Sequence, residues 1–511
     1  MSHERADRLE PALVRVIVVI LLGGILGILN STMASVATET LSREFNTSLS
    51  TISWASTGFL LAVCAMIPFT SWAVDRFGGR RMWLIGLSLF LAASLLCAAA
   101  WNVGSLIAFR AMQGIAAGIL DPLVLVLLAR AAGPARAGRV MGLMGVVLSL
   151  GPVLGPIAGG AVLQGLGWRW MFLLGIPIGL IALLLAVRVV PADRPTGTDD
   201  PTGVDRLTDA DQSTGVDGLT DANQSTGVDR PTSRLDAIGL ALLGPGFAVL
   251  VLAMTQTAEH PAFTAPQVFL PLILAAVMLV GYAVHALRVG DKAPLIDLRL
   301  FKNTGFTASV TVMTLNGLAT FACLFALPLY YQRAHGHGTL AAGLLVAPVG
   351  LGAALAMPLA GALSDRTGSR GLAQGGAVAA ALGGFALTRV GAGTSELWPS
   401  LAAFAMGLGL GFVGAPTMGS LYRTLPTHLV PQGSSVLYML NQLGAGIGIA
   451  LVTVILKTVG DDDVMRGIHG VYGFAIATLA VMLVATAFLP GRTETPLPPA
   501  REAPRTERIT P

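Results

Sequence analysis

Long apolar stretches dominate this chain and constrain its fold more than any other feature. Fourteen of them are long enough to cross the hydrocarbon core of a bilayer, which takes about 20 residues of helix. They cover residues 13–38, 51–74, 82–101, 104–128, 139–163, 169–189, 237–256, 267–287, 305–330, 340–363, 371–390, 398–420, 433–457 and 470–489. The pattern predicts an all-α polytopic membrane protein, because a helix satisfies its own backbone hydrogen bonds in lipid.

Composition supports a membrane protein and excludes other classes. Of the 511 residues, 54% are hydrophobic and 12% are charged, whereas about a quarter of an ordinary soluble domain is charged. The net charge is only +4, and the basic residues are dispersed over many short loops. No nucleic-acid partner is therefore expected. Cys64, Cys97 and Cys323 lie in separate apolar runs, which argues against a disulfide or a metal site. Phosphate-loop, metalloprotease and nucleophile-elbow motifs are absent from the sequence, so neither an enzyme nor a cofactor is expected.

Basic residues predict how these helices are oriented. With the N-terminus in the cytoplasm, most of the 32 lysine and arginine residues fall in cytoplasmic loops and tails. Cytoplasmic loops of membrane proteins carry such an excess. We therefore expect a multi-pass protein of the plasma (inner) membrane, surrounded by lipid, with both termini in the cytoplasm.

A short tandem repeat marks a linker between the sixth and seventh predicted helices. TGVDRLTDADQS at 202–213 recurs as TGVDGLTDANQS at 214–225. This composition buries no core, so 190–236 is predicted to be a cytoplasmic low-complexity linker. Weak calcium binding is an alternative, although a calcium loop also needs a bidentate glutamate. The other predicted parts are a cytoplasmic N-terminus 1–12, a six-helix bundle 13–189, two inserted helices 237–287, a second six-helix bundle 305–489 and a cytoplasmic tail 490–511.

A second repeat relates the two bundles. DRFGGR at 75–80 and DRTGSR at 365–370 share the pattern Asp-Arg-x-Gly-x-Arg, and each follows a predicted helix. An even number of helices separates the two copies, so they face the same side and the bundles are parallel repeats. We call them the first DRxGxR loop (Asp75, Arg76, Gly78 and Arg80) and the second DRxGxR loop (Asp365, Arg366, Gly368 and Arg370).

The DRxGxR loops have two interpretations. A carboxylate and guanidinium groups in a tight turn can pair with facing helix ends, which closes one side of a protein in one state and releases it in another. Alternatively, the arginines only set the topology. The duplicated spacing favours gating.

These motifs together resemble the major facilitator superfamily, and within it the fourteen-helix drug:proton antiporter family of the multidrug efflux type. RAMQGIAAG at 110–118 is similar to the family pattern R-x-x-Q-G-x-x-x-G, and WRWMF at 168–172 is similar to the opening of its sixth helix. GPVLGPIAGG at 151–160 resembles the antiporter motif of exporters. The resemblance covers nearly the whole chain. It implies a major facilitator fold with fourteen transmembrane helices, arranged as two parallel six-helix halves plus two inserted helices.

The antiporter-like motif consists of Gly151, Pro152, Gly155, Pro156, Gly159 and Gly160. Glycines at four-residue intervals form one smooth helix face that another helix can approach closely, and the prolines add kinks. Ordinary small-residue packing is the alternative. The resemblance implies an export-biased hinge between the halves.

Two charged residues lie in the fourth predicted helix. Arg110 and Asp121 are eleven residues apart, which places them within about 20° on one helix face and about 16 Å apart along the axis. A carboxylate inside the membrane is expected to face a water-filled cavity, to titrate or to pair. A desolvated carboxyl can hold a proton and release it when the cavity opens to water. We therefore predict that Asp121, with Arg110, couples transport to protons; a structural Asp121 paired with a basic residue is the alternative.

The first predicted helix departs from the family at one position. The resemblance implies aspartate in a pattern like L-D-x-T-x-x-x-V-A, whereas this chain has LNSTMASVA at 29–37, with Asn30 in its place. Asparagine does not titrate. Either Asp121 has taken over proton coupling, or the stoichiometry or mechanism differs, or the protein is no longer an active antiporter. We favour the first.

The remaining polar side chains in the spans suggest the kind of substrate. Candidates to form hydrogen bonds in an apolar substrate cavity are Asn30, Gln113, Asn316, Asn441 and Gln442, although the last three can equally join helices. One acidic residue and few aromatics favour small lipophilic, neutral or weakly cationic compounds. The sequence thus predicts a secondary active exporter that exchanges such compounds for protons by alternating access. A non-transporting sensor or scaffold, and a uniporter or lipid exporter, are the alternatives.

Overall fold

A computed structural model describes residues 11–133, 136–190, 235–259, 265–289, 294–391, 393–459 and 464–491. Every regular element within these ranges is a helix. The predicted linker and both predicted tails lie almost wholly outside the described residues.

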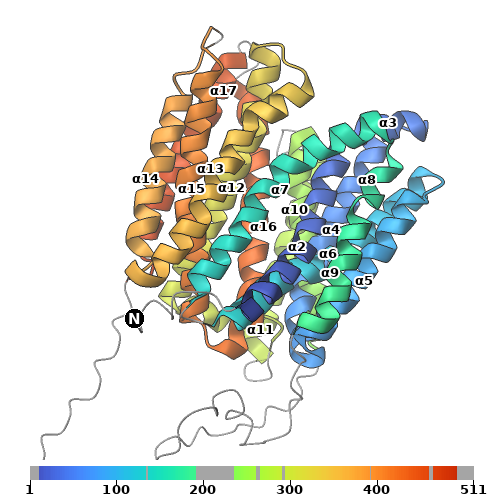
Figure 1. Cartoon of the computed structure of the whole chain (residues 1–511), viewed down its shortest axis with the longest axis vertical. Helices are drawn as coiled ribbons and strands as arrows, with labels where there is room; N and C mark the ends of the chain where they lie inside the picture. The colour runs from blue at the N-terminus through green and yellow to red at the C-terminus, as the bar shows by residue number, and fades with distance from the viewer. Residues whose placement is uncertain are drawn as a thin grey trace, which may run out of the picture.

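The first half of the chain forms a bundle with six membrane-crossing segments (Figure 1). They are α2 (Pro11–Val36), α4 (Leu49–Phe77), α5 (Gly79–Ala98), α6 (Val103–Ala132), α7 (Ala137–Gly165) and the broken pair α8 (Arg169–Leu173) and α9 (Gly175–Val189), with the short α3 (Thr38–Glu44) after α2. Capping residues begin two of them. The Ser48 side chain accepts a hydrogen bond from the Thr51 N–H at α4, and Asn102 with Ser105 forms a capping box at α6.

The second half repeats this series after two additional helices. Its members are α12 (Thr304–Ala334), α13 (Thr339–Thr367), α14 (Arg370–Leu387), α15 (Leu397–Thr424), α16 (Val430–Val459) and α17 (Val464–Thr486). The additional helices, called the insert, are α10 (Ala237–Glu259) and α11 (Pro266–Val289). Short 3₁₀ turns, η2 (Leu298–Lys302) and η3 (Thr427–Leu429), precede α12 and α16.

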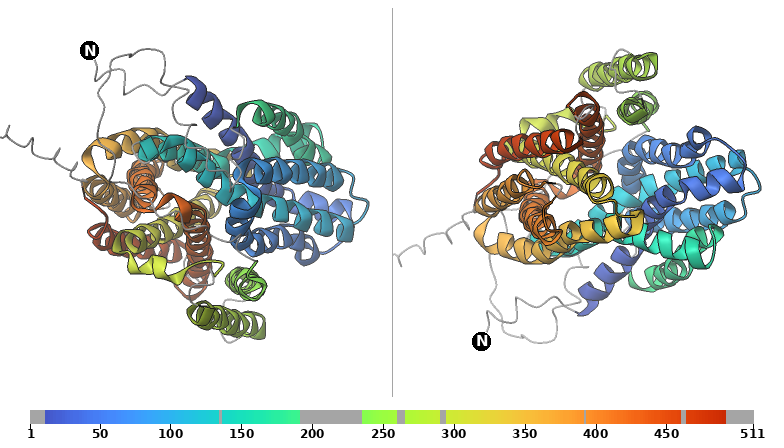
Figure 2. Two further views of the ribbon diagram at one scale, coloured as in Figure 1. Left: turned by 90° about the horizontal axis from the view of Figure 1, so that it is seen from below. Right: turned by 90° about the horizontal axis from the view of Figure 1, so that it is seen from above.

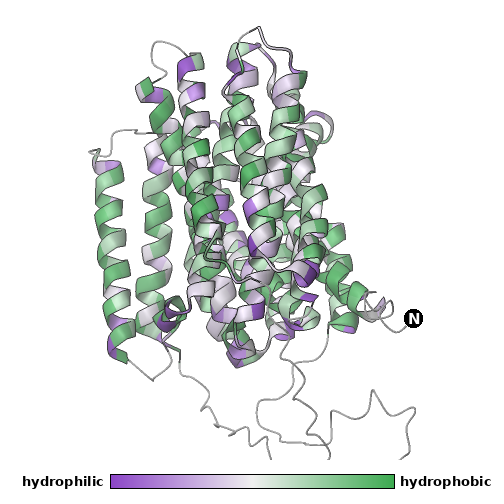
Figure 3. Cartoon of the chain, turned by 90° about the vertical axis from the view of Figure 1, so that its left-hand side faces the viewer, coloured by the Kyte–Doolittle hydropathy of each residue, from purple (hydrophilic) through white to green (hydrophobic). Residues whose placement is uncertain are grey.

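Hydropathy confirms a membrane protein. Among the described residues, thirteen spans are long and apolar enough to cross a membrane, with α8 and α9 counted as one. The remaining helix, α14, has 18 residues rich in glycine and alanine and packs against α15 and α17. Figure 3 shows hydrophobic residues along the middle of the outward faces and hydrophilic residues near the ends. The predicted all-α, fourteen-helix fold is confirmed.

The two halves share one arrangement of neighbours, as parallel repeats require. In the first half α6 packs against α4 and α5, and in the second α15 packs against α13 and α14. Likewise α2 packs against α7 and α9, as α12 packs against α16 and α17. Seen from either end, the halves lie side by side with the insert at one edge (Figure 2).

The DRxGxR loops end two corresponding helices. Gly78 follows α4 with φ 89°, and Gly368 follows α13 with φ 85°. Glycine adopts this left-handed region without steric cost, and each glycine N–H bonds back to the last turn, at Val74 and Ser364. Both loops therefore lie at one end of the molecule, which we call the loop end; the opposite end is the far end.

The halves contact each other toward the loop end. There α7 packs against α13 and α15, while α16 packs against α4 and α6. Glycines allow the α7–α13 crossing: an added Cβ on Gly142 would lie 2.5 Å from the Met357 carbonyl oxygen, and one on Gly361 would collide with the Gly138 backbone. Toward the far end the two halves diverge (Figure 1).

The insert bridges the two halves. α10 packs against both α4 and α16, and α11 packs against α10. The segment after α11 continues the bridge. Ser71 Oγ of α4 donates to the Leu295 carbonyl at 3.4 Å, and the Asp297 N–H donates to Gln432 Oε1 of α16 at 3.0 Å.

Candidate functional site

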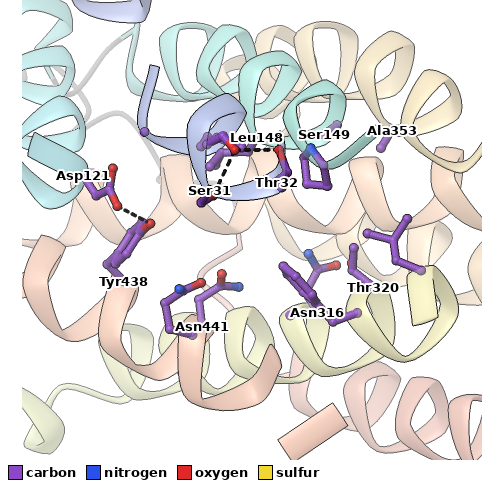
Figure 4. A pocket seen from close by; sticks show the side chains of 18 of the residues that line it. Ser31, Thr32, Asp121, Leu148, Ser149, Asn316, Thr320, Ala353, Tyr438 and Asn441 are labelled. Carbon is purple, nitrogen blue, oxygen red and sulfur yellow. Dashed lines mark hydrogen bonds between the residues drawn. The ribbon is translucent and has the colours of Figure 1, made fainter. Parts of the chain in front are cut away.

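A cavity of about 380 Å³ lies between the two halves and is lined by both. Helices α2, α4, α6 and α7 contribute from the first half, and α12, α13, α15 and α16 from the second. Its lining is mostly apolar with a few polar groups, which is typical of a small-molecule site. Five of the predicted proton-coupling and substrate-cavity residues line it: Arg110, Asp121, Asn316, Asn441 and Gln442. Figure 4 shows three of them, Asp121, Asn316 and Asn441.

Asp121 lies where the halves meet. Tyr438 Oη of α16 donates a 2.7 Å hydrogen bond to Asp121 Oδ2 (Figure 4). On another side Gly27 of α2 faces the carboxyl, and an added Cβ there would be in ordinary van der Waals contact, 3.4 Å from Oδ1. Within the described part of the chain, no basic side chain lies within ion-pair distance of Asp121. The described residues thus do not show the structural ion pair considered as an alternative.

Arg110 is almost fully buried on the same helix, with 1% of its surface exposed. Its Nη1 donates to Asn30 Oδ1 at 2.6 Å and to Gln113 Oε1 at 2.7 Å, and its Nε donates to the Ala55 carbonyl at 3.3 Å. The guanidinium carbon lies 4.2 Å from the centroid of the Phe59 ring. Its Nη2 is buried and has no hydrogen-bond partner among the described residues.

Asn30 and Gln113 are not among the lining residues, which corrects the expectation that they face the cavity. Both are buried, and both amide oxygens accept from Arg110. Gln113 Nε2 also donates to Ser94 Oγ at 2.7 Å. A buried guanidinium needs acceptors, so these amides turn toward Arg110. Asn30 thus supplies an acceptor where the resemblance implied a carboxylate.

The amides of the second half differ from one another. Asn441 Nδ2 donates to the Met313 carbonyl at 2.9 Å and so joins α16 to α12. Asn316 is 7% exposed, and its buried Oδ1 has no partner among the described residues. With Arg110 Nη2, this makes two unsatisfied polar atoms on residues that line the cavity, one in each half.

The glycine face of the antiporter-like motif packs within the first half. Residues 28–33 of α2 occupy the space beside Gly151, Gly155 and Gly159. Another helix therefore approaches this glycine face closely, as the four-residue spacing predicts, and that helix is α2 of the same half. Close approach to the second half comes instead from Gly138 and Gly142, nearer the start of α7.

The rest of the motif lies where α7 changes neighbours. Pro152 lines the cavity, and Pro156 one turn later is half-buried. Gly160 faces open space. Just before the motif, Ser149 and its carbonyl still face α13, close to Met357 and Gly350. The motif therefore begins where α7 passes from α13 to α2.

The second DRxGxR loop reaches across to the first half. Asp365 accepts hydrogen bonds from the N–H groups of Gly138 and Arg139, both at 2.9 Å, in the first turn of α7. It also accepts from Arg423 Nη1 at 2.8 Å, and Arg423 Nη2 donates to Ser369 Oγ at 2.6 Å. A carboxylate at a helix N-terminus satisfies unpaired N–H groups and complements the helix dipole. Asp365 therefore links the halves at the loop end.

The first DRxGxR loop makes a looser ion pair within its own half. Asp75 lies 3.8 Å from Arg130 of α6. The last arginines of the two loops behave alike: Arg80 donates to the Val187 carbonyl in α9, and Arg370 donates to the Leu489 carbonyl after α17 at 2.9 Å. The first arginines of the two loops, Arg76 and Arg366, are exposed.

Two parallel six-helix halves that enclose a mostly apolar cavity with a few polar groups, and that meet at one end and diverge at the other, define a secondary transporter. The comparisons agree. The chain belongs to the Major Facilitator Superfamily, whose family model matches residues 20–449.

Its relatives include drug-resistance proteins. The multidrug resistance protein B homolog of Mycobacterium tuberculosis is 35% identical over 454 residues, which cover 88% of this chain and 77% of that protein. The lincomycin resistance protein LmrB of Listeria innocua is 25% identical over 88% of each chain. The crystal structure of the human organic anion transporter MFSD10 superimposes with a TM-score of 0.60 at 16% sequence identity. The alignment covers 92% of this chain and 100% of that one, so the two share the fold.

These findings confirm the superfamily and its multidrug efflux type. The protein is a multi-pass membrane transporter and not an enzyme. The sequence analysis did not predict every residue of the site; Tyr438 and Arg423 are two that it missed. Neither stands in a recognisable motif, and Tyr438 lies 317 positions from the carboxyl it contacts.

Proposed function

We propose that this transporter exports small lipophilic compounds in exchange for protons by alternating access, with Asp121 as the proton-binding group. The observation that carries the proposal is the placement of Asp121 between the halves, in a cavity, without an ion-pair partner among the described residues. A carboxyl in that position is costly when charged unless water reaches it. It therefore gains and loses a proton as access to the cavity changes.

Asn30 supports Asp121 as the proton site. Arg110 keeps its contact with the first helix through the amide oxygen of Asn30, a group that carries no proton to exchange. Among the described residues that line the cavity, Asp121 is the only aspartate or glutamate. Proton exchange at the cavity is thus assigned to this one carboxyl.

The lining favours a lipophilic substrate with a few hydrogen-bonding groups. Arg110 Nη2 and Asn316 Oδ1 are buried without partners, and a buried unsatisfied polar atom costs about 1–3 kcal/mol. A substrate that offers an acceptor to the guanidinium and a donor to the amide would remove that cost. The names of the relatives support drugs and antibiotics as the class. The proton gradient supplies the energy, without a cofactor.

The second DRxGxR loop serves as the gate in this proposal. Opening the loop end requires breaking the bonds from Asp365 to α7 and separating the α7–α13 glycine crossing. The excess of basic residues supports a cytoplasmic location for the loop end and both termini of this protein in the plasma membrane. The arrangement described is then the one closed to the cytoplasm.

Proton release triggered by substrate in proteoliposomes tests the proposal. A panel of lipophilic cations and neutral antibiotics is applied to the wild type, to Asp121→Asn and to the control Glu39→Gln, an exposed carboxyl of α3 outside the cavity. We expect protons to move with some compound in the wild type and the control, and about tenfold fewer protons to move in Asp121→Asn.

Three results would contradict the proposal. Wild-type behaviour of Asp121→Asn would show that another group carries the proton. Transport that does not depend on the proton gradient would identify a uniporter. An absence of transport in every protein, across the whole panel, would favour the non-transporting sensor.

A further inference from the structure

One hydrogen bond joins the proposed proton site to the opposite half. Tyr438 Oη of α16 donates to Asp121 Oδ2 of α6 at 2.7 Å (Figure 4). One turn earlier on α16, Ser435 Oγ donates to the Ile67 carbonyl of α4 at 3.3 Å. This part of α16 is therefore seated against the first half, and moving it away would break the bond to Asp121.

Tyr438 is the hydrogen-bond donor that the described residues supply to Asp121. α2 presents Gly27 to the carboxyl, and α4 places the buried thiol of Cys64 near it. Within the described ranges, no charged side chain of α2, α4, α5, α7 or α16 lies within ion-pair distance. Thiols and phenols ordinarily ionise at higher pH than carboxyls, so Asp121 is the member of this cluster that loses its proton first.

The strength of this bond depends on the charge of Asp121. Hydrogen bonds to an ionised acceptor are shorter and roughly twice as strong as those between neutral groups. An ionised Asp121 therefore favours the arrangement in which α16 is seated against α6. In the arrangement in which α16 and α6 have separated, Asp121 makes no strong hydrogen bond to Tyr438 that protonation would weaken. A proton therefore binds Asp121 more tightly in that arrangement and shifts the population toward it.

We propose that Tyr438 is a positioning residue that makes proton binding a condition for opening the loop end. The inference rests on the proposed function and adds to it how coupling is enforced. While Asp121 is ionised, Tyr438 keeps the empty transporter closed at the loop end. A proton arriving from the far end neutralises Asp121, weakens the bond and lets α16 separate. Without this bond the empty transporter would return unprotonated and would move substrate only downhill.

Tyr438→Phe tests the inference because it removes the hydroxyl and keeps the ring. Tyr422→Phe is a matched control, since the Tyr422 hydroxyl bonds to Ser434 at 3.0 Å within the second half. In proteoliposomes we expect Tyr438→Phe to keep counterflow of substrate while its proton-driven accumulation falls about tenfold or more, the effect of losing a hydrogen bond to a charged group. Tyr422→Phe should remain coupled. Proton-driven accumulation at the wild-type level in Tyr438→Phe would overturn the inference and leave the proposed function standing.

A conformational measurement keeps the inference testable if Tyr438→Phe folds poorly. Spin labels at the loop end, one on each half, report the closed fraction of wild-type transporter and of Asp121→Asn. Acid should lower the closed fraction of the wild type, whereas Asp121→Asn should have a low closed fraction at every pH. A closed fraction that ignores pH in a wild type shown to exchange protons would overturn the role of Tyr438. Failure of the wild type to exchange protons would instead overturn the proposed function.

Discussion

The two DRxGxR loops have the same residues at the same spacing, yet their aspartates bind different partners. Asp365 reaches the first turn of α7 in the other half and pairs at 2.8 Å with Arg423; the two side chains are 12% and 17% exposed. Asp75 lies 3.8 Å from Arg130 of its own half, and these side chains are 40% and 41% exposed. The motif sets the turn and the charge, whereas the helix that faces it decides whether it can link the halves.

The segment after α11 lies at the corresponding contact of the first loop's half with α16. The second loop meets the N-terminus of α7. Because α16 is the helix of the second half that corresponds to α7, the equivalent position for the first loop is the N-terminus of α16. There Gln432 accepts a hydrogen bond from Asp297, and Ser71 donates to Leu295. The segment after α11 thus contacts both helices. At the α7–α13 crossing the helices meet directly through Gly138 and Gly361. The loop end is therefore asymmetric although the halves are repeats.

The largest effect is expected from removing the charge of the second loop. Asp365→Asn weakens its bonds to α7 and leaves Arg423 without its counter-ion. Because breaking a buried ion pair costs about 3–5 kcal/mol and this pair is partly exposed, we expect about 2–3 kcal/mol against the closed arrangement and loss of most transport. Asp75→Asn, at an exposed pair, should cost about 1 kcal/mol or less. Export rates of both variants in proteoliposomes compare them, and equal losses would contradict the asymmetry.

The next largest effect is expected from exchanging glycine and serine at the position four residues before the aspartate of each DRxGxR loop. Gly361 and Ser71 occupy the same place relative to the two loops. Gly361→Ser inserts a side chain where Gly138 lies and should cost about 1–3 kcal/mol through overpacking, so transport should fall severalfold or more. Ser71→Gly removes a hydrogen bond worth about 0.5–1.5 kcal/mol and should mainly lower thermal stability. Wild-type transport by Gly361→Ser would show that the crossing is not close in the working protein.

The smallest effect is expected where the two loops agree. Arg80 and Arg370 each donate to a carbonyl at the end of the sixth segment of their own half. Arg80→Gln and Arg370→Gln should therefore both destabilise the protein, by about 1 kcal/mol for the carbonyl hydrogen bond that each variant weakens. Thermal unfolding of the purified variants measures both. A clearly larger loss in one of them would show that the halves differ there too.

The helices could be predicted from the sequence almost completely. The predicted span 139–163 corresponds to Ala137–Gly165, and even the weakest one, 371–390, corresponds to Arg370–Leu387. Hydrophobic length is a local property, and lipid accepts few alternatives to a helix of about 20 residues. Helical periodicity likewise predicted that Arg110 and Asp121 share a face, and both line the cavity.

The direction of individual amides was less predictable. Asn30 and Gln113 were expected in the cavity for being polar in a membrane span, yet both turn toward Arg110. The orientation of such a side chain depends on the hydrogen-bond partners that neighbouring helices supply. Hydropathy does not show which helices are neighbours.

The sequence by itself determined the number and the span of the helices, the parallel repeat and the superfamily. It also determined that Arg110 and Asp121 share one face of a helix. These follow from runs, periods and repeated motifs that act over short stretches of chain. Only the tertiary structure decided that Asp365 binds the first turn of α7 and that Tyr438 meets Asp121. Such contacts join residues hundreds of positions apart, and they arise from how the two halves and the insert pack against one another.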